Sequence, residues 1–251
     1  MAENVVPLIT VVTVVYNGVG DLEKTIQSVL NQTYPNIEYI IIDGGSTDGT
    51  IDIIKKYQGR LAYWVSEPDE GIYYAMNKGI QKATGEWIHF RNCGDYFFDI
   101  DAVEKMFSNP VANEVMLLHG DCRVINKDGY VDMQPPILYR SYKKGMPVFH
   151  PSTFVRRSFH VMHPFNTLYR SSSDYEFVYM ALKQAVNIEY RPYIISIYNS
   201  QEGFSVTNWK LAMAEEWDWK YPKFPFKVLF LKINICFWEL RKSIAKIRHN
   251  L

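Results

Sequence analysis

The chain contains few cysteines, and they are not arranged as in a disulfide framework or a thiolate metal site. Three occur among the 251 residues, at Cys93, Cys122 and Cys236, and none belongs to a Cys-x-x-Cys pair. An odd number of widely spaced cysteines argues against a disulfide-stabilised scaffold and against a thiolate zinc site, and it is typical of a reducing compartment.

Long apolar runs and a targeting segment are also missing from the sequence. No uninterrupted apolar stretch is long enough to span a bilayer, and the first residues, Met-Ala-Glu-Asn, lack the basic start of a secretory signal. Apolar residues nevertheless make up 47% of the chain and charged residues 22%, which predicts a packed core. We therefore expect a cytoplasmic protein with one large α/β domain, with or without an appendage.

The formal net charge is zero, but the two signs are unevenly distributed. Of the 27 basic and 27 acidic residues, residues 222–251 hold seven and one, which leaves 20 and 26 in residues 1–221. The body of the chain is therefore acidic and its tail is basic. Because a nucleic-acid-binding protein more often has a basic body, we expect no nucleic-acid partner.

Apolar periodicity predicts that strands and helices alternate through the first hundred residues. The predicted strands are 8–15, 37–42, 62–65 and 87–90, and the predicted helices are 22–30, 50–57 and 72–83. Such alternation with short loops implies right-handed crossovers and a mainly parallel sheet. Farther on, we expect a helix at 101–107, a strand at 115–119, a hairpin turn at Asp128-Gly129, a capped helix from 172 to 182, and strands at 188–190 and 194–198.

The stretch 40–50 predicts a binding loop at the end of a buried strand. Three consecutive isoleucines are typical of a strand buried on both faces, and Asp43 directly follows them. Open α/β sheets place their ligands at the carboxyl ends of strands. Gly44 and Gly45 allow a sharp turn and the close approach of a ligand, and the polar residues 46–48 can cap the next helix. The alternative is an ordinary turn with a helix cap.

A second polar loop follows the strand predicted at 87–90. Its residues Asn92 and Asp95 bring an amide and a carboxylate to the same sheet edge as Asp43 and Asp69. A hard divalent cation takes oxygen ligands, and often only one or two of them come from the protein when substrate phosphates are present. Asp95 is therefore a candidate metal ligand, although such a loop on its own is more often a simple turn.

Six short motifs occur in order along the chain. They are VVYN at 14–17, SVLNQTYP at 28–35, DGGSTDGT at 43–50, EPDEGIYYAMNKG at 67–79, NCGD at 92–95 and SDYEF at 173–177. Together they resemble glycosyltransferase family 2, the nucleotide-sugar-dependent enzymes of the GT-A fold, over residues 8 to about 205. The motif at 67–79 is similar to a subgroup that builds bacterial surface polysaccharides, including colanic-acid-type transferases.

The resemblance implies a fold and a reaction. The fold is a GT-A-like, Rossmann-related α/β/α sandwich of three layers with a mainly parallel mixed sheet at 1–205, followed by a helical, basic C-terminal extension at 206–251. The reaction is an inverting transfer of a sugar from a nucleotide sugar to a hydroxyl of a glycan acceptor. The acceptor implied is linked to polyprenyl diphosphate, in bacterial polysaccharide biosynthesis.

The matched motifs also imply the site residues. The resemblance assigns donor binding to Tyr16, Asp43, Asp69, Asn77 and Asn92. It makes Asp95 the ligand of a Mg²⁺ or Mn²⁺ ion, which neutralises the leaving diphosphate. It makes Asp174 the base that takes the proton of the acceptor hydroxyl. His150 contacts the diphosphate or the acceptor, and a hydrogen-bonded structural histidine is the alternative.

Three positions depart from the family pattern. Gly44 and Asn92 stand where many members have Asp, and Tyr74 stands where the subgroup has Asp. These departures favour a second hypothesis, a catalytically silent partner subunit that binds a nucleotide sugar, whereas Asp95 and Asp174 favour an enzyme. A dinucleotide-binding oxidoreductase is not supported, because the residues after the first predicted strand do not supply Gly-x-Gly-x-x-Gly.

Residues 225–248 predict an amphipathic helix with basic residues beside an apolar stripe. The stripe consists of Phe226, Phe230, Ile233, Phe237, Leu240, Ile244 and Ile247. Such a helix fits an anionic membrane surface, which would place the protein on the inner face of the cytoplasmic membrane beside a lipid-linked acceptor. The same stripe fits packing on the body of the protein, or a short coiled coil in a homodimer.

Overall fold

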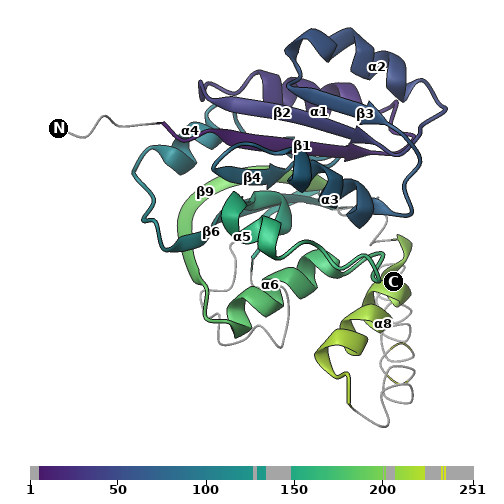
Figure 1. The fold of residues 1–251 in the computed structure, drawn as a ribbon, viewed down its shortest axis with the longest axis vertical. Coiled ribbons are helices and arrows are strands. Elements are labelled where there is room, and N and C mark those ends of the chain that lie inside the picture. The colour runs from purple at the N-terminus through teal and green to yellow at the C-terminus, as the bar shows by residue number, and fades with distance from the viewer. Residues whose placement is uncertain are drawn as a thin grey trace, which may run out of the picture.

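A mixed sheet with helices on both faces forms the centre of the molecule (Figure 1). In this computed structural model, the described residues are 6–126, 129–133, 148–199, 201, 207–223, 233 and 235. The strands are β1 Ile9–Val15, β2 Ile37–Asp43, β3 Tyr63–Ser66, β4 Trp87–Phe90, β5 Tyr96–Phe97, β6 Val115–Asn126, β7 Gly129–Met133, β8 Thr153–Arg156 and β9 Asn187–Asn199. The helices are α1 Leu22–Leu30, α2 Thr50–Tyr57, α3 Ile72–Lys82, α4 Ala102–Phe107, α5 Arg157–Met162, α6 Ser173–Lys183 and α8 Trp209–Lys220, with short 3₁₀ turns at Gln58–Arg60 and His150–Ser152.

The order of the strands reverses direction beside β1. The first four strands are parallel and lie in the order β3-β2-β1-β4. The chain therefore moves from β1 to β2 and β3 on one side, and β4 then pairs with β1 on the other side. Open α/β sheets bind ligands outside the carboxyl ends of the strands at such a switch point. Beyond β4 the sheet continues with antiparallel β8, then β6, β9 and β5, and β7 pairs with β6.

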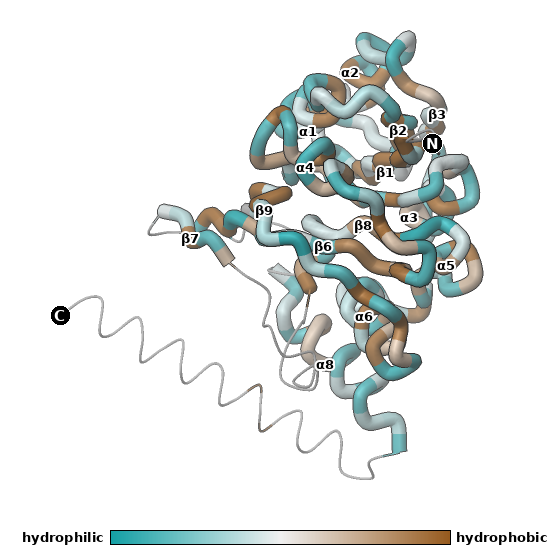
Figure 2. Tube along the Cα trace, turned by 90° about the vertical axis from the view of Figure 1, so that its left-hand side faces the viewer, coloured by the Kyte–Doolittle hydropathy of each residue, from teal (hydrophilic) through white to brown (hydrophobic). Residues whose placement is uncertain are grey.

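Two apolar clusters cover the two faces of the sheet. One cluster joins the sheet to α1, α2 and α4, and the other joins it to α3, α5 and α6. Ile41 belongs to the first cluster, and Ile40 and Ile42 belong to the second, because successive side chains of a strand point to opposite faces. The trace in Figure 2 is accordingly hydrophobic along the central strands. The predicted three-layer α/β/α sandwich is confirmed.

The elements predicted in the first hundred residues are confirmed, with ends shifted by one or two residues. In the second half, the strands predicted at 188–190 and 194–198 are one strand, β9, whose register against β6 jumps from Tyr190 to Ile194. Pro192 lies within this irregularity and has no N–H to donate to the sheet, and the strand bulges there without ending. The strand predicted at 115–119 extends to Asn126, which lies opposite Gly129 in the predicted hairpin.

Other elements in the second half were not predicted, or cannot be compared with the structure. Strand β8 and helix α5 follow one another directly at 153–162 and were missed. Helix α8 falls within the predicted helical extension, whereas the helix predicted at 225–248 lies outside the described residues apart from 233 and 235. Among the helices in the described part of the chain, none is long and apolar enough to cross a bilayer.

Gly79 marks the closest approach of α3 to β1. A Cβ atom at this position would overlap Cγ1 of Val12, which is fully buried. Overpacking costs about 1–3 kcal/mol, which exceeds the gain of about 1 kcal/mol in helix propensity. We predict that Gly79→Ala lowers the free energy of unfolding in urea. Gly59→Ala is the control, because a Cβ there meets no atom within 4 Å, and equal losses in the two variants would contradict the packing argument.

Candidate functional site

The carboxyl ends of the parallel strands bring the predicted donor-binding residues to one edge of the sheet. Val15 at the end of β1 pairs with Asp43 at the end of β2, and Asp43 pairs with Ser66 at the end of β3. Tyr16, Asp69 and Asn92 lie in the loops that leave β1, β3 and β4. These positions converge on the switch point, although they are spread over 77 residues of sequence.

Asp43 is the buried centre of the loop after β2. Its Oδ2 accepts hydrogen bonds from the N–H groups of Gly45 and Ser46, at 3.1 and 2.9 Å, and from Oγ of Ser66 at 2.6 Å. Oδ1 accepts one bond, from Oγ of Ser46 at 2.5 Å. Because each carboxylate oxygen has two lone pairs, Oδ1 retains the capacity for one more donor. Asp43 therefore shapes the loop and joins it to β3.

The loop after β1 is hydrogen-bonded to the loop after β2. The N–H of Asn17 donates to Oγ of Ser46 at 2.7 Å, and the N–H of Thr47 donates to Oδ1 of Asn17 at 2.9 Å. Asn17 has φ 50°, a left-handed conformation that asparagine tolerates better than most residues. The preceding residue, Tyr16, is 69% exposed. An aromatic face is therefore presented beside a rigid pair of loops.

The two glycines predicted to form a sharp turn have different roles. Gly45 has φ 82°, and a Cβ there would lie 3.2 Å from the backbone nitrogen of Pro68, so glycine is required at this turn. A Cβ at Gly44 would lie 3.5 Å from the ring of Tyr16, an ordinary contact distance. The position that departs from the family pattern thus faces Tyr16.

Asp69 is paired with a lysine that was not predicted as a site residue. Nζ of Lys78 lies 2.6 Å from Oδ1 of Asp69 and 2.7 Å from Oε1 of Glu67. Burial lowers the pKa of Lys78, but its bonds to the two carboxylates more than offset this, and the net change is upward. Oδ2 of Asp69 is buried and has no hydrogen-bond partner among the described residues. Asp69 is consequently fixed in position and can still accept a donor.

Asn77 holds the segment before α6 in place. Its Nδ2 donates to the carbonyl of Phe165 at 2.8 Å, and its Oδ1 accepts the N–H of Phe165 at 2.9 Å. Both functional groups of the amide are used by these bonds. In this structure Asn77 holds the segment at Phe165, and its second amide N–H and second oxygen lone pair remain for a further partner.

Asn92 and Asp95 have the properties expected of cation ligands. Oδ1 of Asn92 is buried without a hydrogen-bond partner in the described part of the chain. Burial raises the pKa of Asp95 to about 7, against the opposing positive charge of Arg91. No group of three His, Cys, Asp or Glu side chains that could hold a metal ion occurs among the described residues. The pair instead fits a cation that takes its remaining ligands from phosphate and water.

The side chain of Arg91, the residue before this loop, is a fully buried cation. Its Nη1 donates to Oγ of Ser196 at 2.8 Å, and its Nη2 lies 2.7 Å from Nε2 of His89. Nδ1 of His89 lies 2.9 Å from the carbonyl of Thr153, so a neutral His89 donates there and accepts from Arg91. Burial lowers the pKa of Arg91 to about 10, which leaves it positively charged near Asp95 at neutral pH.

Asp174 is joined to this edge by a tyrosine on α3. It lies in the first turn of α6, and its Oδ1 accepts a hydrogen bond from the hydroxyl of Tyr73 at 2.8 Å. Burial raises the pKa of Tyr73 well above its usual value, and the charge of Asp174 raises it further, so Tyr73 is a neutral donor. The ring of His150 stacks on Phe90, the last residue of β4, at 5.7 Å. Burial lowers the pKa of His150, while the negative charge of Asp174 opposes this.

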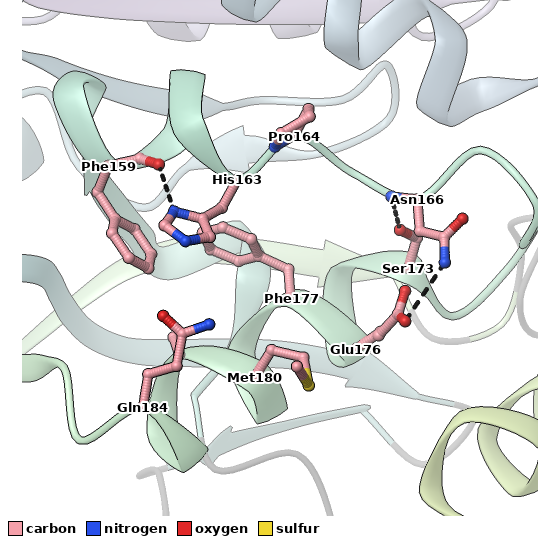
Figure 3. A pocket seen from close by; sticks show the side chains of 10 residues that line it. Phe159, His163, Pro164, Asn166, Ser173, Glu176, Phe177, Met180 and Gln184 are labelled. Atoms are coloured by element: carbon pink, nitrogen blue, oxygen red, sulfur yellow. Dashed lines mark hydrogen bonds between the residues drawn. The ribbon is translucent and has the colours of Figure 1, made fainter. Parts of the chain in front are cut away.

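A separate pocket of about 190 Å³ lies between α5 and α6 (Figure 3). Phe159, Phe177 and Met180 form much of its wall. At its edge, His163 lies 3.0 Å from the carbonyl of Phe159 through Nδ1, and Asn166 is bonded to Ser173 and Glu176. None of the predicted site residues lines this pocket. It is therefore distinct from the candidate site at the sheet edge.

Comparison with known sequences matches residues 10–178 to the family described as Glycosyl transferase family 2. An uncharacterized glycosyltransferase of Mycobacterium tuberculosis (strain ATCC 25618 / H37Rv) is 41% identical over 100 residues, which cover 39% of this chain and 38% of the relative. A PGL/p-HBAD biosynthesis glycosyltransferase of Mycobacterium bovis (strain BCG / Pasteur 1173P2) is 26% identical over 211 residues, 80% of each chain.

Solved structures share the fold of this chain at low sequence identity. The mannosyltransferase PcManGT from Pyrobaculum calidifontis, in complex with GDP-Man and Mn²⁺, superimposes with a TM-score of 0.66 at 18% identity, over 90% of this chain and 69% of that one. S. aureus TarS 1-349 in complex with UDP-GlcNAc gives a TM-score of 0.64 at 17% identity, over 84% and 66%. These similarities confirm the predicted GT-A fold.

The bonds around Asp43 predict a structural cost that is independent of any ligand. Asp43→Ala leaves two backbone N–H groups and two hydroxyl groups without their acceptor. A buried unsatisfied donor costs about 1–3 kcal/mol, so we expect the free energy of unfolding in urea to fall by about 2–4 kcal/mol. Asp48→Ala is the control, because Asp48 also accepts loop hydrogen bonds but is exposed. A loss no larger at 43 than at 48 would contradict the structural role.

Proposed function

Because the chain belongs to glycosyl transferase family 2, we propose that it transfers a sugar from a nucleotide-sugar donor to a hydroxyl of an acceptor, with inversion at the anomeric carbon. The observation that carries the proposal is the hydrogen bond from Tyr73 of α3 to Asp174, which fixes the orientation of this carboxylate. The helix dipole favours negative charge in the first turn of α6, as a base requires.

The donor in this proposal is a nucleoside diphosphate sugar bound by the loops that leave β1 to β4. Tyr16 offers its exposed ring, and Asp43 and Asp69 each keep a carboxylate oxygen with room for a further donor hydrogen. UDP-GlcNAc is bound by S. aureus TarS and GDP-Man by PcManGT, so both are suitable probes. A thermal-shift panel of UDP-, GDP-, dTDP- and CMP-sugars with Mn²⁺ selects the nucleotide, since a bound ligand stabilises the fold by mass action.

The reaction is one direct displacement. Asp174 takes the proton of the acceptor hydroxyl as the hydroxyl oxygen attacks the anomeric carbon, and the nucleoside diphosphate leaves from the opposite face. Asp95 and Asn92 would hold a Mg²⁺ or Mn²⁺ ion, which supplies charge neutralisation to the leaving diphosphate. His150 stacks on Phe90 and is electrostatically linked to Asp174, and in this proposal it contacts the acceptor or the diphosphate.

For the acceptor we propose a glycan on a polyprenyl diphosphate carrier, in the synthesis of a bacterial surface polysaccharide of the colanic-acid type. The 67–79 motif supports the polysaccharide role, and the M. bovis relative is named for the biosynthesis of PGL/p-HBAD. The departures at Gly44, Tyr74 and Asn92 keep a catalytically silent binding subunit as the second candidate. Release of nucleoside diphosphate from a bound donor would exclude that candidate.

The first test of the mechanism is Asp174→Asn. A general base contributes about 10²–10⁴-fold, and an amide cannot take the proton, so transfer should fall by that factor while the donor-induced thermal shift is retained. Glu176→Gln, in the same turn of α6, is the matched control. Transfer at a near wild-type rate in the Asn variant would disprove the assignment of the base.

The second test concerns the proposed metal ligand. Asp95→Ala should weaken donor binding in the presence of Mn²⁺ or Mg²⁺ and have little effect in EDTA, because the carboxylate acts through the ion. Asp99→Ala, at an exposed position of the same loop region, should bind the donor normally in both conditions. The metal role is wrong if the wild-type protein binds and turns over the donor equally well in EDTA.

For the basic tail we propose docking to an anionic membrane, as a peripheral protein on its cytoplasmic face. Each basic residue near such a surface contributes about 1 kcal/mol, and residues 222–251 have an excess of six positive charges. Full-length protein should co-sediment with phosphatidylglycerol liposomes at low salt, and less so at 1 M salt, where the screening length is about 3 Å. If protein lacking residues 225–251 sediments equally well at low salt, the tail instead packs on the body or forms a dimer.

A further inference from the structure

Helix α8 contacts the turn that carries Asp174, although it lies beyond the predicted end of the catalytic domain. In Figure 1 it lies beside the start of α6. Its residue Glu215 is only 8% exposed, which is unusual for a carboxylate that has no ion-pair partner among the described residues. A buried charge needs compensating hydrogen bonds, and the partners of Glu215 show what it does.

The carboxylate of Glu215 accepts three consecutive backbone N–H groups. Oε1 accepts the N–H of Arg170 at 2.8 Å, and Oε2 accepts those of Ser171 and Ser172 at 2.9 and 3.0 Å. Oε2 also accepts the hydroxyl of Ser172 at 3.2 Å. Amide groups just before a helix point toward solvent or toward an anion, and here the anion is supplied by the chain itself.

The hydroxyl of Ser172 is engaged by α8 and does not cap α6. Ser172 is the residue before the first turn of α6, but its side chain makes no capping hydrogen bond to the helix. Its hydroxyl instead donates to Glu215 and accepts from Nε1 of Trp219 at 3.2 Å. The indole of Trp219 also packs against Tyr175 and Tyr179 at 5.1 and 4.9 Å. Helix α8 therefore contacts both the N-cap residue Ser172 and the first turns of α6.

Asp174 thus lies on a turn that is held by two other helices. Tyr73 of α3 bonds its carboxylate directly, and Glu215 of α8 fixes the backbone two to four residues before it. A reacting group displaced by about 1 Å can lose roughly 10²-fold in rate. Three bonds to one buried carboxylate restrict the path of this turn more than an exposed loop would.

We propose that Glu215 is a positioning residue, which fixes the turn 170–172 and thereby places Asp174 for proton abstraction. Helix α8 is then part of the catalytic unit. This inference rests on the proposed function of Asp174 as the base, and it extends the functional domain past 205 to the end of α8. Glu215 acts through the backbone of this turn and through the hydroxyl of Ser172.

The sharpest variant is Glu215→Gln. It preserves the volume of the side chain, but an amide group replaces one carboxylate oxygen and cannot accept the bonds that this oxygen accepts now. Glu216→Gln is the matched control, because Glu216 is the next residue of α8 and contacts Lys220 instead of the turn. Hydrogen exchange of a peptide spanning 168–178 should become faster by roughly tenfold or more in the first variant and be unchanged in the second.

The functional readout is release of nucleoside diphosphate from the donor selected by the thermal-shift panel, with water as the acceptor. Glu215→Gln should lower kcat by about 10- to 100-fold and leave the affinity for the nucleoside diphosphate, measured by calorimetry, unchanged. Glu216→Gln should leave both unchanged. When Asp174→Asn is already present, Glu215→Gln should lower the residual rate no further, because the group that it positions is gone.

Each alternative has its own outcome. Unchanged hydrogen exchange, or a wild-type kcat in Glu215→Gln, would overturn the positioning role. An equal loss of rate in the wild-type and Asp174→Asn backgrounds, or a parallel loss of nucleotide affinity, would show that Glu215 is only structural. A wild-type rate in Asp174→Asn alone would instead overturn the proposed base, and it is distinguishable because that variant leaves Glu215 intact.

Discussion

The reversal of strand order beside β1 is the constraint on which the candidate site depends. Because β4 pairs with β1 on the side opposite β2, the strand order reverses at β1, and open α/β sheets bind ligands outside the carboxyl ends of the strands at such a point. The buried carboxylate of Asp43 then accepts hydrogen bonds from Ser46, within the loop after β2, and from Ser66 at the end of β3. These bonds hold the loop against β3. The orientation of Tyr16, Asp69 and the Asn92–Asp95 loop follows from this frame.

The frame could be predicted because its signals are local. The unit of β2 and α2, for example, is defined by a run of β-branched residues, a short polar loop and a glycine at position 45 with φ 82°. Local signals fail in the second half of the chain. The strands predicted at 188–190 and 194–198 are one strand with a bulge, and β8 and α5 adjoin each other with no turn residues between them. Ser172 has a typical capping sequence, but a distant carboxylate engages its hydroxyl.

The residues of the candidate site were predicted more readily than the contacts that hold them. Asp174 could be found from its motif, whereas its partner Tyr73 lies 101 residues earlier. Asn77 was predicted to bind the donor, but its pairing with Phe165, 88 residues away, was not predicted. Glu215 carries no recognisable signal, because a glutamate on an aromatic helix normally faces solvent. Long-range pairing of this kind depends on how the elements pack, which no local pattern encodes.

The central claim is that the nucleotide sugar binds at the switch point between the loops after β1 and β4. A crystal structure of the full chain with the nucleoside diphosphate and Mn²⁺ tests it most directly. The account predicts a base beside Tyr16 and Asp43 and a diphosphate beside Asn92 and Asp95, on the side of the sheet edge where Tyr73 bonds Asp174. A nucleotide bound instead in the pocket between α5 and α6, away from these residues, would contradict it.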